Sequence, residues 1–161
     1  GSVIPRFINL AKMNKPLPVT DLRMTRFMMS LDQSVDLVLH ALIYGKNGDI
    51  FVQKSPACKI IDLAKAIHIY LKKKENINII GSRHGEKLNE TLVSFEEMAL
   101  TKETKNHFII KNDGRSLDYN LYEDLGNKKR IKSTDYNSDS TNQLNIKEII
   151  SLLKSIKVDL N

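Results

Sequence analysis

The sequence contains only one cysteine, Cys58, among its 161 residues. A lone cysteine cannot form an internal disulfide, and such cysteine usage is typical of a protein kept in a reducing compartment. No second cysteine or nearby histidine accompanies it as a metal ligand or catalytic partner. We therefore expect Cys58 to be a small buried hydrophobic residue.

Long apolar stretches are also missing. No apolar run approaches the roughly 20 residues that a membrane-spanning helix requires. No secretory signal peptide is visible, and the sequence begins with Gly1 rather than methionine. We expect a cytoplasmic protein without a membrane span, and we interpret the chain as a piece of a longer protein.

The sequence also lacks a G-x-x-G-x-x-G loop after a strand. That loop is the phosphate cradle that a bound dinucleotide needs. We therefore expect no cofactor to be bound by this chain alone. We also assign it no catalytic residue and no metal ligand.

Positive charge is in excess, with 25 Lys and Arg against 19 Asp and Glu, a net charge of +6 and a pI near 9.3. A basic domain can bind nucleic acid. However, the short clusters at 72–74 and 128–130 are not interleaved with aromatic residues. We interpret them as a solvated helix end and a solvated loop, so nucleic-acid binding is the weakest functional hypothesis.

The length fits one domain, since domains usually span about 100–200 residues. The 41% of hydrophobic residues is enough for a core, and their spacing predicts alternating helices and strands, which is typical of an α/β fold. Residues 88–101 are ambiguous, and 111–143 are loop-rich. The predicted helices cover 2–13, 35–44, 60–71 and 144–158, and the predicted strands cover 17–20, 26–31, 50–53, 77–80 and 107–111.

The most informative motif is R-H-G-E-K at 83–87, directly after the strand predicted at 77–80. Gly81 and Gly85 indicate a tight turn there. Arginine can bind a phosphate with two parallel hydrogen bonds, and a neighbouring carboxylate can accept hydrogen bonds from sugar hydroxyls. The turn therefore predicts binding of a nucleoside diphosphate, and a surface turn with a weak local ion pair is the alternative.

Arg26 lies among apolar neighbours in M-T-R-F at 24–27. A buried or half-buried arginine needs a partner. That partner could be a bound ligand, or an internal acid such as Asp32 or Asp36. The residues alone leave both alternatives open.

Four sequence blocks together resemble a known family. They match, in the same order, the C-terminal substrate-binding half of the polysaccharide-biosynthesis branch of the extended short-chain dehydrogenase/reductases. That branch includes UDP-N-acetylglucosamine 4,6-dehydratases and UDP-sugar 4-epimerases. The resemblance implies one substrate-binding lobe over residues 1–161, without the N-terminal Rossmann half. The blocks are G-S-V-I-P-R-F at 1–7, M-T-R-F-M-M-S-L-D at 24–32, G-D-I-F-V-Q-K at 48–54 and R-H-G-E-K-L at 83–88.

The resemblance implies how a nucleotide would be bound. Arg26 and Arg83 would contact the diphosphate, and Glu86 would accept hydrogen bonds from the ribose hydroxyls. Lys87 would be either a second phosphate contact or a surface lysine. A further segment, Val3, Ile4 and Pro5, would lie along the uracil ring.

Some positions depart from the family pattern. Leu22 stands where the family usually has proline, and Asn89 stands where it usually has tyrosine. Arg115 and Asp118 belong to an altered match to a family segment, and we interpret them as a loop ion pair. These changes fit a decaying gene nearly as well as a divergent active enzyme.

The Tyr-x-x-x-Lys pair of the family is expected upstream of residue 1. Tyr70 and Lys74 have the same spacing, but they come near the end of a predicted helix and just before a strand. We interpret them as a solvated helix end.

The leading hypothesis is the UDP-sugar-binding portion of a 4,6-dehydratase or 4-epimerase in capsule, O-antigen or other surface-polysaccharide biosynthesis. The full-length family uses NAD or NADP, so the implied partners are a UDP-sugar and the missing Rossmann half. A non-catalytic remnant is the alternative. Because the strand at 50–53 and its neighbours would pack on the missing half, we expect an exposed apolar surface that promotes self-association, including a homo-oligomer.

Overall fold

The computed structural model describes residues 3–112 and 134–156. The chain divides into two compact units, and the predicted lobe therefore comprises both. The first unit contains Gly1–Ser30, Ser55–Glu90 and Ser138–Asn161, and the second contains Leu31–Lys54 and Thr91–Asn137.

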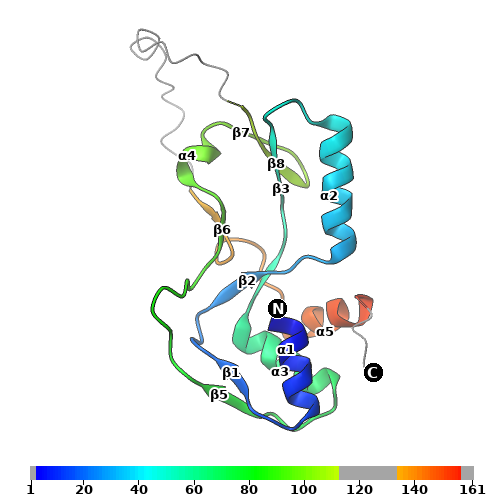
Figure 1. Cartoon of the computed structure of the whole chain (residues 1–161), viewed down its shortest axis with the longest axis vertical. Coiled ribbons are helices and arrows are strands. Elements are labelled where there is room, and N and C mark those ends of the chain that lie inside the picture. Colours follow the sequence, from blue (N-terminus) through cyan, green and yellow to red (C-terminus); the bar gives the residue numbers. More distant parts are fainter. Residues whose placement is uncertain (1–2, 113–133, 157–161) are drawn as a thin grey trace. The chain divides into compact units, whose positions relative to one another are not determined.

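The first unit combines three helices with two pairs of short strands (Figure 1). Strand β1 pairs with β5 in parallel, and β2 pairs with β4 in antiparallel, with Arg26 opposite Cys58. Its elements are α1 (Val3–Lys12), β1 (Leu17–Val19), β2 (Thr25–Phe27), β4 (Ala57–Lys59), α3 (Ile60–Tyr70), β5 (Ile77–Ile79) and α5 (Ile146–Ser155).

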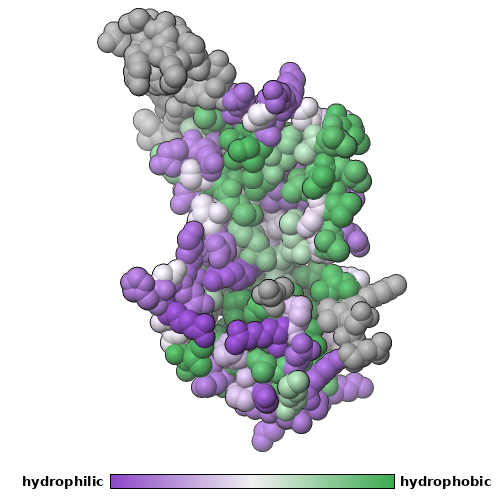
Figure 2. Space-filling view, in the orientation of Figure 1, coloured by the Kyte–Doolittle hydropathy of each residue, from purple (hydrophilic) through white to green (hydrophobic). Residues whose placement is uncertain are grey.

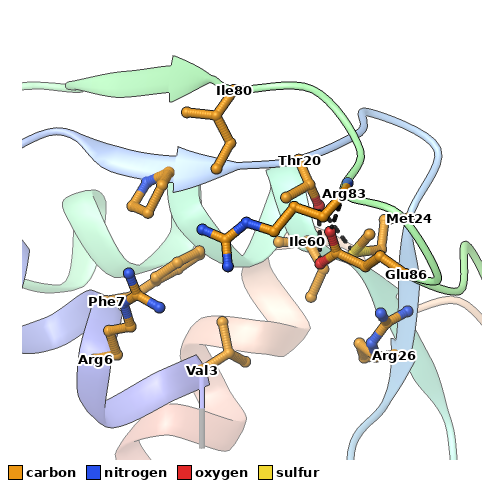
Figure 3. Close-up of a pocket in the computed structure, with 11 residues that line it drawn as sticks. Val3, Arg6, Phe7, Thr20, Met24, Arg26, Ile60, Ile80, Arg83 and Glu86 are labelled. Atoms are coloured by element: carbon orange, nitrogen blue, oxygen red, sulfur yellow. Dashed lines mark hydrogen bonds between the residues drawn. The ribbon is translucent and has the colours of Figure 1, made fainter.

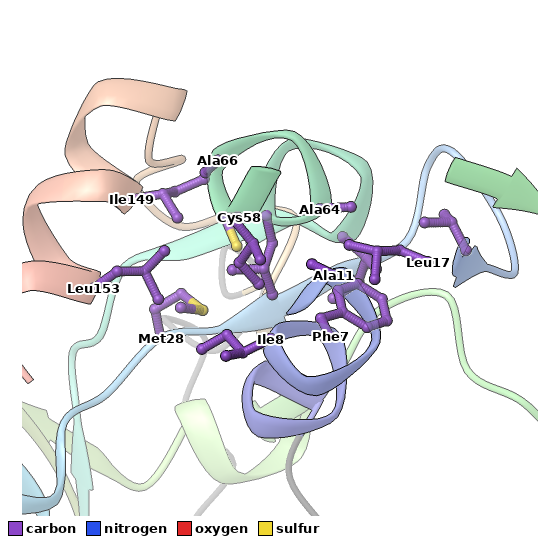
Figure 4. Close-up of a cluster of buried hydrophobic side chains, with 14 of the residues drawn as sticks. Phe7, Ile8, Ala11, Leu17, Met28, Cys58, Ala64, Ala66, Ile149 and Leu153 are labelled. Carbon is purple, nitrogen blue, oxygen red and sulfur yellow. The ribbon is translucent and has the colours of Figure 1, made fainter. Parts of the chain in front are cut away.

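The core of this unit lies among the three helices (Figure 4). Phe7 and Ile8 of α1 are buried, as are Ile149 and Leu153 of α5. The spacing of these residues places them on one face of each helix, and α3 supplies buried residues from both of its ends. Burial of such apolar faces is the main stabilising contribution to the unit.

The second unit has a three-stranded antiparallel sheet in the order β3-β8-β7 and a separate pair, β6 with β9. Phe108 and Ile110 of β8 are buried, and the ring of Phe108 lies 4.9 Å from that of Tyr136. Its elements are α2 (Leu31–Tyr44), β3 (Ile50–Gln53), β6 (Thr91–Val93), α4 (Phe95–Met98), β7 (Thr101–Glu103), β8 (His107–Ile110) and β9 (Tyr136–Asn137).

Helix α2 has no buried residue. Leu31 and Leu42 are each 79% exposed, and Ile43 and Tyr44 are 69% and 67% exposed. Figure 2 shows this hydrophobic surface over α2. We call Leu31, Val35, Val38, Leu39, Leu42, Ile43 and Tyr44 the α2 apolar surface, because contiguous exposure of this kind marks an interaction site.

The structure confirms the α/β class and most predicted elements. Strands β4, β6, β7 and β9 were not predicted, and the extended run predicted over 26–31 is too long, because β2 ends at Phe27 and α2 begins at Leu31. Cys58 is fully buried as expected, and burial raises the pKa of its thiol to about 12. None of the helices in the described ranges is both long and apolar enough to cross a bilayer.

Candidate functional site

Four of the seven predicted binding residues line one pocket in the first unit (Figure 3). The pocket has a volume of about 410 Å³, which is in the range of small-molecule sites. Val3 comes from α1, Arg26 from β2, and Arg83 and Glu86 from the turn after β5. The fold therefore brings together residues that are up to 83 positions apart in the sequence.

The apolar side of the pocket is continuous with the core of the first unit. Phe7 of α1, Met24 before β2 and Ile60 at the start of α3 are buried residues that line it. An apolar wall beside a few charged groups is typical of pockets that bind a flat or cyclic ligand group. Val3, Pro18 and Ile80 complete this wall.

The turn after β5 has the geometry that its glycines predict. Gly81 and Gly85 both have a φ of 79°, a conformation that glycine adopts without the steric cost borne by other residues. The turn is closed by a hydrogen bond from the Glu86 backbone N–H to the Arg83 carbonyl, with an N···O distance of 3.1 Å. Arg83 and Glu86 are thereby placed on the same short segment at the pocket.

The Glu86 carboxylate is held by neutral donors. Its Oε2 accepts a hydrogen bond from the Arg83 backbone N–H at 3.3 Å, and its Oε1 accepts one from the Thr20 hydroxyl at 3.4 Å. No ion pair between Glu86 and an arginine forms within the described part of the chain. Because a carboxylate has about four acceptor positions, this group retains capacity for ligand hydroxyls.

Arg26 is bound mainly to the backbone. Its Nη1 donates to the carbonyls of Thr25 at 2.7 Å and Leu88 at 3.1 Å, and its Nη2 donates to that of Lys87 at 2.9 Å. Its Nε lies 3.5 Å from the Glu90 carboxylate. The guanidinium thus fixes the segment that follows the Arg83 turn. The internal acid that it contacts is Glu90, not Asp32 or Asp36.

Arg83 and Arg6 differ from Arg26 in this respect. Both line the pocket and are exposed. Neither guanidinium makes a hydrogen bond or ion pair with residues 3–112 or 134–156. In Figure 3 the Arg83 side chain extends from its turn across the pocket toward α1, where Arg6 and Phe7 lie.

Three predicted binding residues are not among those that line the pocket. Ile4 packs against the hydrophobic core, while Pro5 and Lys87 are exposed. Arg115 and Asp118 lie outside the described residues. Tyr70 and Lys74 were expected to be solvated. Lys74 is exposed, but Tyr70 is half-buried.

Sequence reasoning missed several lining residues, chiefly Arg6, Thr20 and Met24. The available signal was that Arg6 and Met24 belong to the same two sequence blocks as Val3 and Arg26. Thr20 follows β1, and only the parallel pairing of β1 with β5 brings it near Glu86. That proximity could not be deduced from sequence spacing.

The described residues offer no recognisable site for a metal ion, and the sequence offers no motif for a dinucleotide. No group of three or more His, Cys, Asp or Glu side chains in the described ranges could hold a metal ion. The whole sequence also has no Gly-rich loop to receive a pyrophosphate at a helix N-terminus. The pocket instead offers guanidinium groups, one carboxylate and an apolar wall.

These features agree with comparisons to known proteins. Residues 1–112 match the family described as "Polysaccharide biosynthesis protein", and residues 113–158 match the family described as "Polysaccharide biosynthesis protein C-terminal". The chain belongs to this polysaccharide-biosynthesis family, as its sequence blocks predict.

Several similar curated proteins are from Rickettsia. A "UDP-glucose 4-epimerase" of Rickettsia bellii (strain OSU 85-389) is 52% identical over 97% of this chain and 46% of its own length. One with the same name from Rickettsia rickettsii (strain Sheila Smith) is 50% identical with the same coverage. The chain therefore spans about half the length of these relatives.

A solved structure has the same fold. The "X-ray structure of Pen from Bacillus thuringiensis" matches 96% of this chain and 45% of that protein, with a TM-score of 0.77 and 32% sequence identity. The match extends over nearly the whole chain, so the fold is shared with an experimentally determined structure.

Proposed function

We propose that this chain is the UDP-sugar-binding portion of a nucleotide-sugar 4-epimerase or 4,6-dehydratase that acts in surface-polysaccharide biosynthesis. The observation on which this proposal depends is the convergence of Arg83, Glu86 and an apolar wall on one pocket. The name of the Rickettsia relatives supports UDP-glucose or UDP-galactose as the ligand, and UDP-N-acetylglucosamine is the alternative.

The pocket suggests how the nucleotide would be placed. Arg83 would donate to the diphosphate, because its guanidinium has no acceptor in the described part of the chain and can offer a bidentate fork. Glu86 would accept from the ribose hydroxyls through its remaining acceptor positions. Arg26 would keep the turn in place and could add one further donor.

The uracil would lie at the start of α1. Val3 lines the pocket beside Phe7 and Met24, which offer apolar surface to a flat ring. Ile4 and Pro5 would contribute through the backbone of this segment. Lys87, exposed on the turn, would be a secondary contact to phosphate.

The chemical step would need groups that this sequence does not contain. In the full-length family, NAD or NADP supplies transient hydride removal at C4 of the sugar, together with a Tyr-x-x-x-Lys pair. The chain itself would bind and orient the UDP-sugar, which contributes to rate only beside a reactive centre.

The second partner would be a Rossmann half that covers the α2 apolar surface. The relatives are about twice as long as this chain, so a further segment of comparable size is available to cover it. Seven large apolar residues exposed on one helix are far more than an isolated surface helix normally shows. The exposed Ile50 of β3 extends the apolar area within the same unit.

Calorimetric titration of UDP and uridine tests the ligand assignment. UDP should bind to the parent chain, and Arg83→Ala should weaken this binding roughly ten- to a hundred-fold, since charge-assisted hydrogen bonds are worth about 1.5–3 kcal/mol. Uridine should bind equally to both. Arg23→Ala is the matched control, because Arg23 is exposed, pairs with Asp21 and does not line the pocket. Equal UDP affinity in all three proteins would exclude the assignment.

A further inference from the structure

Arg6 is the arginine of the pocket to which neither the motifs nor the family resemblance assigns a role. It lies in the first turn of α1 and lines the pocket together with Arg83. Its side chain has no acceptor among the described residues. Arg6 is therefore either a solvated surface arginine or a residue that binds an anionic ligand in the pocket.

The charges around the pocket are not balanced. Three guanidinium groups face a single carboxylate, and that carboxylate is held by Thr20 and a backbone N–H. Within residues 3–112 and 134–156, Arg26 is the one of the three with an ion-pair partner, Glu90 at 3.5 Å. The guanidinium groups of Arg6 and Arg83 thus have no ion-pair partner among the described residues and lie on the same pocket, which favours an anionic ligand.

Arg26 cannot offer a bidentate fork while its present bonds hold. A guanidinium has five N–H donors. Both donors of Nη1 and one of Nη2 are bonded to carbonyl groups, and Nε faces Glu90. By contrast, no side-chain donor of Arg6 or of Arg83 is bonded to a residue that the structure describes. The donor inventory thus points to Arg6, not Arg26, as the second partner of a diphosphate.

The position of Arg6 on its helix also favours a role in anion binding. The first turn of α1 contains no acidic residue. A cation near a helix N-terminus interacts unfavourably with the helix dipole, so this arginine is not placed there for helix stability. An anion bound at Arg6 would offset that unfavourable interaction.

We propose that Arg6 is a further anion-binding residue, which holds the diphosphate from the α1 side while Arg83 holds it from the turn after β5. This rests on the proposed function, because the diphosphate is that of the UDP-sugar. Arg26 is then a positioning residue that fixes the turn through the carbonyls of Lys87 and Leu88.

The test is calorimetric titration of UDP and inorganic pyrophosphate into the parent, Arg6→Ala, Arg6→Lys, Arg83→Ala and the control Arg23→Ala. Arg6→Ala should lower the affinity for both ligands roughly ten- to a hundred-fold. Arg6→Lys should recover part of the loss, because an ammonium keeps the charge but not the planar fork. Melting curves confirm that each variant is folded, which the exposure of Arg6 favours.

The two ligands separate failure of this inference from failure of the proposed function. UDP binding that is lost in Arg83→Ala but unchanged in Arg6→Ala would overturn the role of Arg6 alone. Pyrophosphate binding that depends on Arg6, without any UDP binding, would support the role of Arg6 and overturn the nucleotide assignment. Absence of binding of either ligand to the parent would overturn both.

Discussion

Among individual residues, Ser138 joins three segments of the first unit that are distant in the sequence. Its hydroxyl lies 2.7 Å from the Thr25 hydroxyl, and it accepts a hydrogen bond from the Glu90 backbone N–H at 2.9 Å. The Thr25 hydroxyl also donates to Asn89 Oδ1 at 3.1 Å. Both Thr25 and Ser138 are fully buried, so these groups cannot turn to water instead.

Ser138→Ala should therefore destabilise the chain. The substitution removes the oxygen that bonds the buried Thr25 hydroxyl and the part-buried Glu90 N–H, and loss of such a partner costs roughly 1–3 kcal/mol. Chemical denaturation of the parent and the variant measures this. Ser151→Ala is the control, because Ser151 is exposed on α5 and should change stability by less than about 0.5 kcal/mol. A neutral Ser138→Ala would show that water replaces the hydroxyl.

Cys58 should be unreactive in the folded chain. It is fully buried, and burial, aided by Asp62, raises the pKa of its thiol to about 12. Since the thiolate is the reactive form, modification at pH 8 should be slow in buffer and fast in denaturant. A thiol-reactive dye followed by absorbance measures both rates. Fast modification of the folded chain would contradict the assigned position of β4.

The site was only partly predictable at this scale. Arg83 and Glu86 could be found because a glycine turn with a cation and a carboxylate is a local signal. The bonding state of Arg26 could not, because its acceptors at Lys87 and Leu88 are about sixty residues away. Arg6 was missed for a related reason. Whether its guanidinium is paired with an acid depends on the fold and cannot be deduced from neighbouring residues in the sequence.

Among secondary-structure elements, α2 departs most from the usual helix of a compact domain. Its apolar residues recur at helical spacing, yet none is buried. Val38 and Leu42 are 65% and 79% exposed and lie one turn apart. The helix therefore has an apolar face that its own unit does not bury.

The double variant Val38→Glu with Leu42→Lys should reduce self-association of the chain. Both side chains are exposed, so stability should change little, and the new pair has the favourable i, i+4 order. Light scattering across a concentration series and a melting curve measure the two effects. Ile69→Lys on α3 is the control, because Ile69 is 57% exposed but outside the α2 apolar surface. Equal association of parent and double variant would exclude this surface as its cause.

The sequence predicts the longer elements better than the short strands. α1, α3 and α5 bury apolar faces that recur every three or four residues, which is a signal within one segment. β4 and β7 have three residues each and exist through pairing with β2 and β8. No local pattern encodes such pairing, so both strands were missed, as were β6 and β9, which pair with each other.

For the whole molecule, the central consequence of the proposed function is that binding and chemistry are divided between two parts. This chain offers the pocket, while the family's Gly-rich loop and Tyr-x-x-x-Lys pair would come from the remaining length of its relatives. The exposure of the α2 apolar surface supports such a division, because a second part of the protein would cover it.

The purified 161-residue chain should show no turnover of UDP-glucose or UDP-N-acetylglucosamine and should not retain NAD or NADP. The physical reason is that its sequence has no Gly-rich loop for the dinucleotide, and that its one Tyr-x-x-x-Lys spacing, Tyr70 and Lys74, lies at a helix end. Coupled assays for sugar products and absorbance of the purified protein at the cofactor wavelengths measure this. Robust turnover by the pure chain would show that the division of labour is wrong.

The most direct measurement is amide chemical-shift mapping of the isotopically labelled chain during titration with UDP. Our account predicts saturable shifts concentrated at Val3, Arg6, Thr20, Met24 and the turn at 83–87, with residues 31–54 unaffected. The Arg83→Ala variant should lose these shifts at the same UDP concentration. Absence of saturable shifts, or shifts confined to the lysine cluster at 72–74, would contradict the claim that this pocket binds a nucleoside diphosphate.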